Sequence, residues 1–325
     1  IESLRQQTYD NIEIIIVDNG SNDGTPQMVK ESFPEVHLVE LDRNTGPYHG
    51  RNVGAAASKG DILFFLDDDA TMERNSLSEI VARFGVEEDL GVIVCKLIET
   101  RTGRPDPNAL DPRLYDGVTN PRECEFYLGD IVAEGITAIR TEVFEKVGRW
   151  PAHYFRASVG KEISYRIIDA GYNMIWFPKA IAHHKSSPIG GISREQIERE
   201  KTFYRTRNLL WIYWTHMPVT RAMFESGISV TYYLFDSIRN RVFLFYAKGL
   251  LAALSSMPRL LRTERKPISK KALAKIDYLK YGTLVTDSAA LDNIVPIPFT
   301  KVMRTRFKYL NKSKAGPSLK RSNDG

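Results

Sequence analysis

The sequence predicts an α/β fold, with a mostly parallel sheet flanked by helices and a helical C-terminal extension. Short apolar runs rich in β-branched residues recur in the first half of the chain, as at 12–17 and 62–66. Turn residues and helix-start signals separate these runs, which is typical of βαβ units. From about Arg194 the apolar residues recur at helical spacing, with many aromatics.

The elements of the first half follow one another with clear boundaries. The run IEIIIV at 12–17 is continuously apolar, as a buried parallel strand requires. Asp23-Gly-Thr-Pro then predicts a helix with Thr25 as N-cap and Pro26 at its first position. We expect further strands at 36–41 and 62–66 and a helix at about 48–58.

The second half continues the alternation less regularly. A strand is expected at 91–97, a long loop at 100–130, strand-like structure at 131–140, a helix at 162–170 closed by Gly171, and a strand at 173–177. We predict a sheet domain over residues 1–215 and a helical, basic extension over 216–325 with a disordered tail.

Composition and charge narrow the class of protein. Of the 325 residues, 42% are hydrophobic and 26% are charged, which argues against disorder. Two cysteines, Cys95 and Cys124, provide no disulfide framework and favour a cytoplasmic protein. Residues 256–325 hold 16 basic and 5 acidic residues, so an anionic partner is expected there. We predict peripheral attachment to the inner face of a membrane rather than nucleic-acid binding; the alternative is a solvated tail.

Acidic side chains follow two of the predicted strands. Asp18 ends the first, and Asp67, Asp68 and Asp69 end the third. Ligands of α/β sheets bind at the carboxyl ends of strands. Asp67 and Asp69 can converge while Asp68 points away, because alternate side chains of a strand share a face. Such carboxylates suit Mg²⁺ or Mn²⁺; the alternative is a solvated acidic turn or a helix cap.

Two further groups complete the predicted site. His184 follows the strand at 173–177, and a neutral imidazole is a plausible third metal ligand. A single histidine is more often structural, and His183 could exchange roles with it. Arg51 lies in a helix start that suits a phosphate or nucleotide. The glycine spacing matches neither a dinucleotide fingerprint nor a P-loop.

Three segments resemble family-2 glycosyltransferases. They are VDNGSNDGT (17–25), the run from Arg43 to Ala70 that contains FFLDDDA, and the segment from Gly135 to His184. The likeness covers about residues 1–215. YRTRNLLW (204–211) is similar to an element of bacterial members that build surface polysaccharides, including rhamnosyltransferase-like ones.

The resemblance implies a GT-A fold and a nucleoside-diphosphate sugar donor, with UDP, dTDP or GDP. It implies that Asp18 contacts the base or ribose, that Arg51 lines the nucleotide site and that Asp67 lies near the ribose. We also assign Asn19 and Asp68, their chain neighbours, to nucleotide-sugar binding.

The resemblance also implies a divalent cation, Mn²⁺ or Mg²⁺, that bridges the donor diphosphate. Asp69 would bind it through the family's DXD motif, with Asp67, and His184 matches the histidine beside the metal. Two departures stand out. The family normally begins with a strand that is not seen before Ile1, so we expect these residues alone to be less soluble than a longer chain. In the segment 155–166, Glu162 is the only acid where many members have a pair.

We therefore predict an inverting, metal-dependent glycosyltransferase that acts on a glycan or lipid-linked acceptor in surface polysaccharide or glycolipid assembly. Glu162 is the predicted catalytic base, because it lies at a helix start near the edge of the sheet. The alternative for Glu162 is a helix cap, with Asp130 and Glu134 as the next candidate bases. The alternatives for the whole chain are a nucleotidyltransferase and a non-catalytic, membrane-associated nucleotide-sugar-binding protein.

Overall fold

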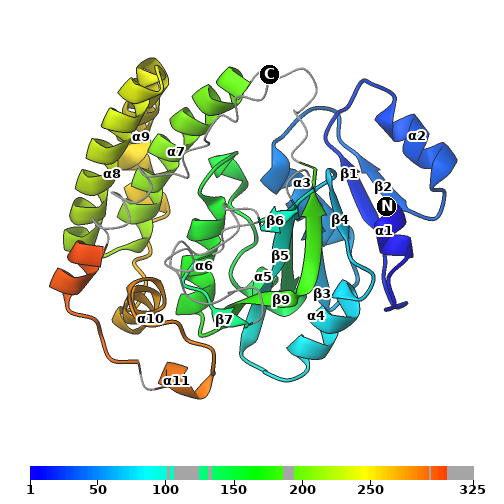
Figure 1. The fold of residues 1–325 in the computed structure, drawn as a ribbon. Coiled ribbons are helices and arrows are strands. Elements are labelled where there is room, and N and C mark those ends of the chain that lie inside the picture. The colour runs from blue at the N-terminus through cyan, green and yellow to red at the C-terminus, as the bar shows by residue number, and fades with distance from the viewer. Residues whose placement is uncertain (101–102, 106–123, 131–133, 186–193, 293, 306–325) are drawn as a thin grey trace, which may run out of the picture.

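A computed structural model of the chain describes residues 1–100, 103–105, 124–130, 134–185, 194–292 and 294–305 (Figure 1). It has a central sheet with helices around it and a group of long helices alongside. This arrangement confirms the predicted α/β class and the helical C-terminal region.

Strands and helices are interspersed through the first 184 residues. The strands are β1 (Ile15–Asp18), β2 (His37–Glu40), β3 (Ile62–Leu66), β4 (Ala70–Met72), β5 (Leu90–Glu99), β6 (Arg104–Pro105), β7 (Phe126–Tyr127), β8 (Ile136–Arg140) and β9 (Asn173–His184). The helices among them are α1 (Glu2–Arg5), α2 (Thr25–Ser32), α3 (Pro47–Ala57), α4 (Ser76–Phe84), α5 (Thr141–Lys146) and α6 (Val159–Asp169). After β9 come α7 (Arg194–His216), α8 (Val219–Arg239), α9 (Phe243–Thr263), α10 (Lys270–Tyr281) and α11 (Ala289–Asp292).

The main sheet has the strand order β3-β8-β5-β9-β4, with β6 beside β5 and β7 beside β9. Strands β5 and β9 pair in parallel, and β8 pairs antiparallel with both β3 and β5. Consequently β3, β5 and β9 run in the same direction, and their carboxyl ends lie at one edge of the sheet. Strands β1 and β2 form a separate parallel pair. The apolar runs predicted the strands but not the reversed direction of β8, because periodicity carries no information on strand direction.

Most predicted boundaries are confirmed within two or three residues. The strand at 62–66 is reproduced as β3, and the helix predicted at 48–58 is α3. One cap differs, because Gly24 is the N-cap of α2 with a φ of 88° and Thr25 already belongs to the helix. Strand β9 continues well beyond the predicted end at 177 and includes both histidines. This extension fixes the position of His184.

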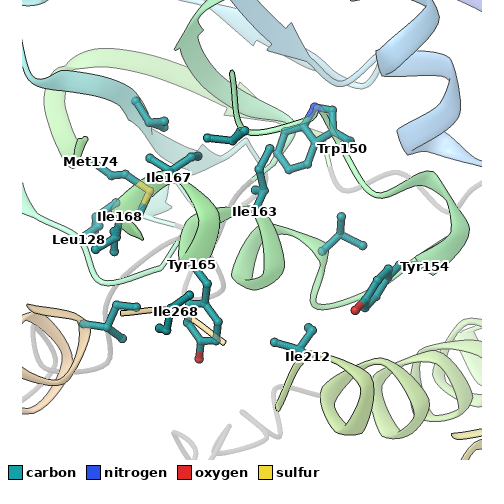
Figure 2. Close-up of a cluster of buried hydrophobic side chains, with 14 of the residues drawn as sticks. Leu128, Trp150, Tyr154, Ile163, Tyr165, Ile167, Ile168, Met174, Ile212 and Ile268 are labelled. Atoms are coloured by element: carbon teal, nitrogen blue, oxygen red, sulfur yellow. The ribbon is translucent and has the colours of Figure 1, made fainter. Parts of the chain in front are cut away.

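The hydrophobic core continues from the sheet into the C-terminal helices. Residues 90–95 of β5 are fully buried, as expected for a central strand. Figure 2 shows members of this cluster, which extends from Trp150 and Ile163 to Ile212 of α7. Leu260, Ile268, Ala272 and Ile276 belong to the same cluster. The predicted division near residue 215 therefore crosses one continuous core, and it stays a prediction.

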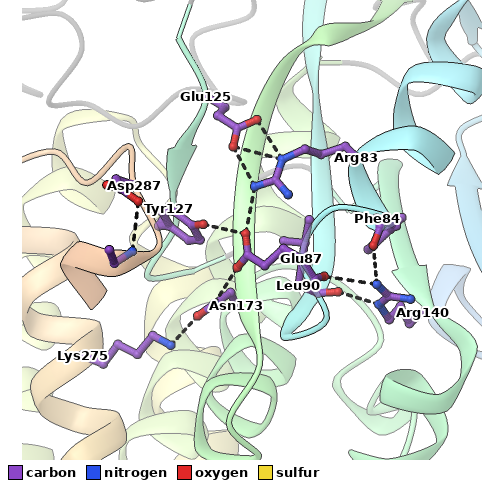
Figure 3. Close-up of polar contacts among 11 residues, drawn as sticks. Arg83, Phe84, Glu87, Leu90, Glu125, Tyr127, Arg140, Asn173, Lys275 and Asp287 are labelled. Atoms are coloured by element: carbon purple, nitrogen blue, oxygen red, sulfur yellow. Dashed lines mark hydrogen bonds and ion pairs between the residues drawn. The ribbon is translucent and has the colours of Figure 1, made fainter. Parts of the chain in front are cut away.

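A polar network lies where β9 begins, at the end of the sheet opposite His184 (Figure 3). Arg83 binds Glu87 at 2.9 Å and Glu125 at 2.7 Å. The Tyr127 hydroxyl and the Asn173 amide also donate to Glu87, at 2.7 and 2.8 Å. Because these partners come from α4, β7 and β9, the network holds the three elements together.

Helices α7, α8 and α9 pack against one another beside the sheet (Figure 1). Trp211 of α7 donates to Ser256 of α9 at 2.9 Å, and Tyr246 of α9 donates to the Val230 carbonyl of α8 at 3.0 Å. None of the helices in the described ranges combines the length and the apolar character needed to cross a bilayer.

Candidate active site

The register between β4 and β9 brings Asp69 and His184 together. Ala70, the first residue of β4, pairs with His184, and the Lys185 amide donates to the Asp69 carbonyl at 3.0 Å. As a result, Oδ2 of Asp69 lies 3.0 Å from Nε2 of His184, and both side chains are about three-quarters buried. His183 points elsewhere and pairs with Glu73 at 3.0 Å. The structure therefore selects His184 over His183 as the neighbour of the acidic cluster.

Asp67 belongs to the same strand end but has a different partner. Its Oδ1 lies 2.7 Å from Nη2 of Arg51, and its amide donates to the Gly135 carbonyl at 2.9 Å. A Cβ atom on Gly135 would lie 1.9 Å from the Asp67 carboxylate, so a side chain at this position would displace that carboxylate. Asp68 is exposed. Within the described ranges, no three His, Cys, Asp or Glu side chains are grouped closely enough to hold a metal ion. Asp67 therefore lies apart from the pair formed by Asp69 and His184.

The acidic cluster has an excess of negative charge. Burial raises the pKa of Asp69, the His184 neighbour lowers it, and the charges of Asp67 and Asp68 raise it again, with a net increase. Proximity of like charges without a cation has this effect on carboxylates. The paired carboxylate and imidazole of Asp69 and His184 are ligands that Mn²⁺ and Mg²⁺ accept. The donor set therefore fits a divalent cation.

Arg51 is oriented by aromatic side chains. Its guanidinium lies 5.3 Å from the ring centre of Tyr48 and 6.0 Å from that of Trp150. Asn52 binds both the amide and the carbonyl of Trp150, at 3.0 and 2.8 Å. These contacts hold Arg51 beside Asp67.

The loop after β1 and the loop before α3 form one unit. Oδ2 of Asp18 accepts the amides of Gly20 and Ser21 at 3.1 and 2.9 Å, which shapes the loop after β1. Oδ1 of Asn19 accepts the amide and hydroxyl of Thr45 at 2.9 and 3.0 Å. A Cβ on Gly20, where φ is 78°, would lie 2.7 Å from Cα of Arg43. The motif at 17–25 and the beginning of the motif that starts at Arg43 are therefore in direct contact.

Glu162 does not have the environment of a catalytic base. It is buried, its Oε1 lies 2.9 Å from Nε of Arg166 and 2.9 Å from Nε2 of His216, and its Oε2 lies 2.5 Å from Nη2 of Arg166. Arg166 also donates to the carbonyls of Val147 and Arg149. Glu162 is only 4% exposed and is held by Arg166 and His216, a geometry that favours a structural role over the predicted role of catalytic base. The sequence could not show this, because His216 is 54 residues away.

Replacing Glu162 by glutamine is expected to lower stability rather than turnover. Burial raises the pKa of Glu162, but the His216 hydrogen bond and the Arg166 charge lower it more, so the net shift is downward. A lowered folded pKa contributes stability above the unfolded pKa, and this is lost as pH falls through the folded pKa. Removing one partner of a buried pair costs about 3–5 kcal/mol, and glutamine keeps part of the hydrogen bonding.

Urea unfolding of Glu162→Gln and of the parent chain, at neutral and at acidic pH, measures this effect. We expect the stability difference to shrink at acidic pH. A variant with unchanged stability at neutral pH would contradict a structural role for Glu162.

The two alternative bases have contrasting environments. Burial raises the pKa of Asp130, but Lys280 at 2.6 Å and Lys161 at 3.4 Å lower it more, so it stays well below its usual range. Glu134 is half-buried, and its Oε1 accepts the Gly160 amide in the first turn of α6 at 2.8 Å. Burial raises the pKa of Tyr48, and the charge of Glu134 and a hydrogen bond to it raise the pKa further. Glu134 directly precedes Gly135, which contacts Asp67.

The segment before α6 is strained and is held by α7. Phe155, Ala157 and Ser158 have φ values of 62°, 64° and 64°, in the left-handed region. The buried amide of Asn208 donates to the carbonyls of Tyr154, Arg156 and Ala157 at 3.1, 2.6 and 2.8 Å. The Arg-Asn pair of the YRTRNLLW segment therefore shapes this loop. The YRTRNLLW motif could be seen in the sequence, but its hydrogen bonds to the loop before α6 are visible only in the fold.

Comparisons with known proteins agree with this geometry. Residues 1–148 match the family described as Glycosyl transferase family 2. Glycosyltransferase AglE of Haloferax volcanii is 29% identical over 205 residues, which are 60% of this chain and 64% of that protein. Succinoglycan biosynthesis protein ExoO of Rhizobium meliloti is 38% identical over 84 residues, 26% of this chain and 24% of that protein. The chain thus spans less than two thirds of these relatives' lengths.

The fold also has a counterpart among solved structures. The crystal structure of GalNAc-T7 with UDP, GalNAc and Mn²⁺ aligns with a TM-score of 0.51 and 16% identity, over 81% of this chain and 54% of that one. At this identity the likeness concerns the fold, and it agrees with the predicted GT-A architecture. The motifs at the strand ends and the fold agree with the family match, in which residues 1–148 of this chain are similar to glycosyl transferase family 2.

Proposed function

We propose that the chain transfers a sugar from a nucleoside-diphosphate sugar to an acceptor hydroxyl, with inversion and with a divalent cation. The observation that carries the proposal is the pairing of Asp69 with His184 at 3.0 Å, next to the Arg51–Asp67 ion pair. The family match supports it. GalNAc-T7, whose structure contains UDP, GalNAc and Mn²⁺, offers a precedent for this donor class on the same fold.

Asp69 and His184 would hold the cation, and Asp67 would join them after turning from Arg51. A cation bound there would neutralise the charge that develops on the leaving diphosphate. Released from Asp67, Arg51 could donate to the donor phosphates, because a guanidinium suits phosphate geometry. Asp18, Asn19 and Asp68 would act at the nucleotide-sugar side, on and near the joined loops 18–21 and 43–46.

We assign the catalytic base to Glu134 in place of Glu162. Inverting transfer forms a bond from the acceptor oxygen to the anomeric carbon, breaks the bond to the diphosphate and moves the hydroxyl proton to a base. Glu134 lies at the N-terminus of α6, where the helix dipole favours a negative charge. It is also one residue from Gly135, which contacts the donor-site Asp67.

The acceptor and the location of the protein belong to the same proposal. Relatives such as ExoO, a succinoglycan biosynthesis protein, support a role in cell-surface polysaccharide or glycolipid assembly. We place the protein at the inner face of the membrane, with a glycan or lipid-linked acceptor. The residues beyond 305, which contribute six of the basic side chains in the C-terminal segment, lie outside the described ranges.

A donor screen tests the function. The full chain is incubated with UDP-, GDP- or dTDP-sugars, with and without Mn²⁺, and the melting temperature and the release of nucleoside diphosphate are measured. We expect one nucleotide class to raise the melting temperature, and this only with the cation. Release of pyrophosphate from a nucleoside triphosphate and a sugar phosphate would instead identify a nucleotidyltransferase. Stabilisation without any turnover would favour a binding protein.

A further inference from the structure

The turn between α8 and α9 exposes large apolar side chains. Phe235 and Ile238 at the end of α8 are 63% and 56% exposed, and Phe243 and Leu244 at the start of α9 are 50% and 60% exposed. We call residues 235–248 the α8–α9 tip. Apolar groups gathered at one surface site, rather than scattered singly, indicate an interaction surface.

The α8–α9 tip is a built structure and not a loose loop. Val242 is buried, and its amide donates to the Ser237 carbonyl at 2.8 Å. Arg241 adopts a φ of 57°, which turns the chain sharply between the helices. Tyr246 is buried and ties α9 to α8 through the Val230 carbonyl. The exposed apolar groups are therefore presented on a rigid hairpin.

Basic side chains surround these apolar groups. Arg239, Arg241 and Lys248 are exposed, and within the described part of the chain neither arginine forms an ion pair. Asp236, the acid of the tip, is engaged by Arg205 at 3.4 Å and Asn240 at 3.1 Å. The free charge of the tip is therefore positive. A second copy of the chain would bring the same positive charge to this surface, which disfavours self-association through it.

We propose that the α8–α9 tip docks the protein on an anionic membrane surface. Apolar side chains enter the boundary between headgroups and acyl chains, while the basic groups attract anionic lipid. In Figure 1 the tip lies on the same side of the molecule as the carboxyl end of β9, where Asp69 and His184 meet. Docking would turn the site toward the membrane, which, on the proposed function, suits a lipid-linked acceptor.

Vesicle sedimentation of the full chain tests the docking. Phosphatidylcholine vesicles with and without phosphatidylserine are compared for three double variants: Phe243→Glu/Leu244→Glu, Arg239→Glu/Arg241→Glu, and the control Val219→Glu/Met223→Glu. Val219 and Met223 are 50% and 61% exposed but lie at the other end of α8. We expect both tip variants to bind phosphatidylserine vesicles at least about tenfold more weakly, and the control to bind like the parent.

A truncation after residue 305 separates the tip from the basic tail. A cut near residue 255 is unsuitable, because Leu260, Ile268 and Ala272 beyond it are core residues. We expect the chain ending at 305 to keep most of its binding. Loss of binding on truncation, with the tip variants unaffected, would overturn the proposal in favour of the tail. Tip variants that change only the oligomeric state, measured by light scattering, would overturn it in favour of a second copy.

Membrane docking and sugar transfer are tested separately, because different residues are expected to carry them. Asp69→Asn is expected to sediment with vesicles like the parent, and the tip variants are expected to bind donor like the parent. Circular dichroism melting of each variant checks that it is folded.

Discussion

Replacing Asp69 with asparagine is expected to weaken donor binding in the presence of Mn²⁺ by at least about 100-fold. The β4–β9 register holds this carboxylate 3.0 Å from His184, so the substitution removes the charged member of the proposed cation site. A cation held by Asp69 would offset the negative charge of the donor diphosphate, and a 100-fold loss of affinity corresponds to about 2.8 kcal/mol. Asp67→Ala is expected to have a smaller effect, because Asp67 also pairs with Arg51.

Calorimetric titration with the donor found in the screen, with and without Mn²⁺, measures the loss. Without the cation, the variant and the parent are expected to bind the donor equally weakly, which separates metal binding from misfolding. Asp61→Asn is the matched control, since Asp61 is exposed at the opposite end of β3. Equal donor affinity of Asp69→Asn and the parent in Mn²⁺ would refute the cation assignment.

Replacing Glu134 with glutamine is expected to lower the rate of transfer by about 10²–10⁴-fold, the usual contribution of general base catalysis. Glutamine keeps the size of the side chain and can still accept the Gly160 amide, but it cannot take a proton. Because the group acts on the acceptor, the donor affinity and the Michaelis constant for the donor are expected to change little. Initial-rate kinetics with saturating acceptor measures the effect.

Two further variants test whether the loss of rate comes from the missing basicity at position 134. Glu134→Asp keeps basicity with a shorter side chain and is expected to recover part of the rate. Glu162→Gln is expected to retain the turnover of the folded fraction while losing stability, the opposite of Glu134→Gln. A Glu134→Gln protein with a full transfer rate would exclude Glu134 as the base.

Much of the fold was accessible from local sequence patterns. The continuous apolar run at 62–66 and the proline-led helix start at Pro26 predicted β3 and the beginning of α2 nearly to the residue. Both signals are local, because a buried strand must be apolar on both faces and proline suits a first helical turn. The direction of β8 and the small strand β4 were not predicted, since they depend on pairing with distant strands.

The candidate site also combines features that local sequence predicts with features that depend on distant residues. Asp67 and Asp69 could be predicted because they end an apolar strand at the edge where α/β sheets bind ligands. The choice of His184 over His183 required the pairing of β4 with β9. The position of Glu162 at a helix start is a local feature that the sequence shows, whereas its partner His216 comes from the far end of α7 and is visible only in the fold.

The sequence by itself determined the α/β class, the family resemblance and the acidic cluster, because apolar periodicity, turn residues and motif spacing act over a few neighbouring residues. Only the tertiary structure decided which acids are available for chemistry. It buries Glu162 between Arg166 and His216, pairs Asp130 with two lysines, and leaves Glu134 at the start of α6, one residue from Gly135, which contacts Asp67. Burial and ion pairing set the state of a carboxylate, and both depend on residues that are far apart in the chain and meet only on folding.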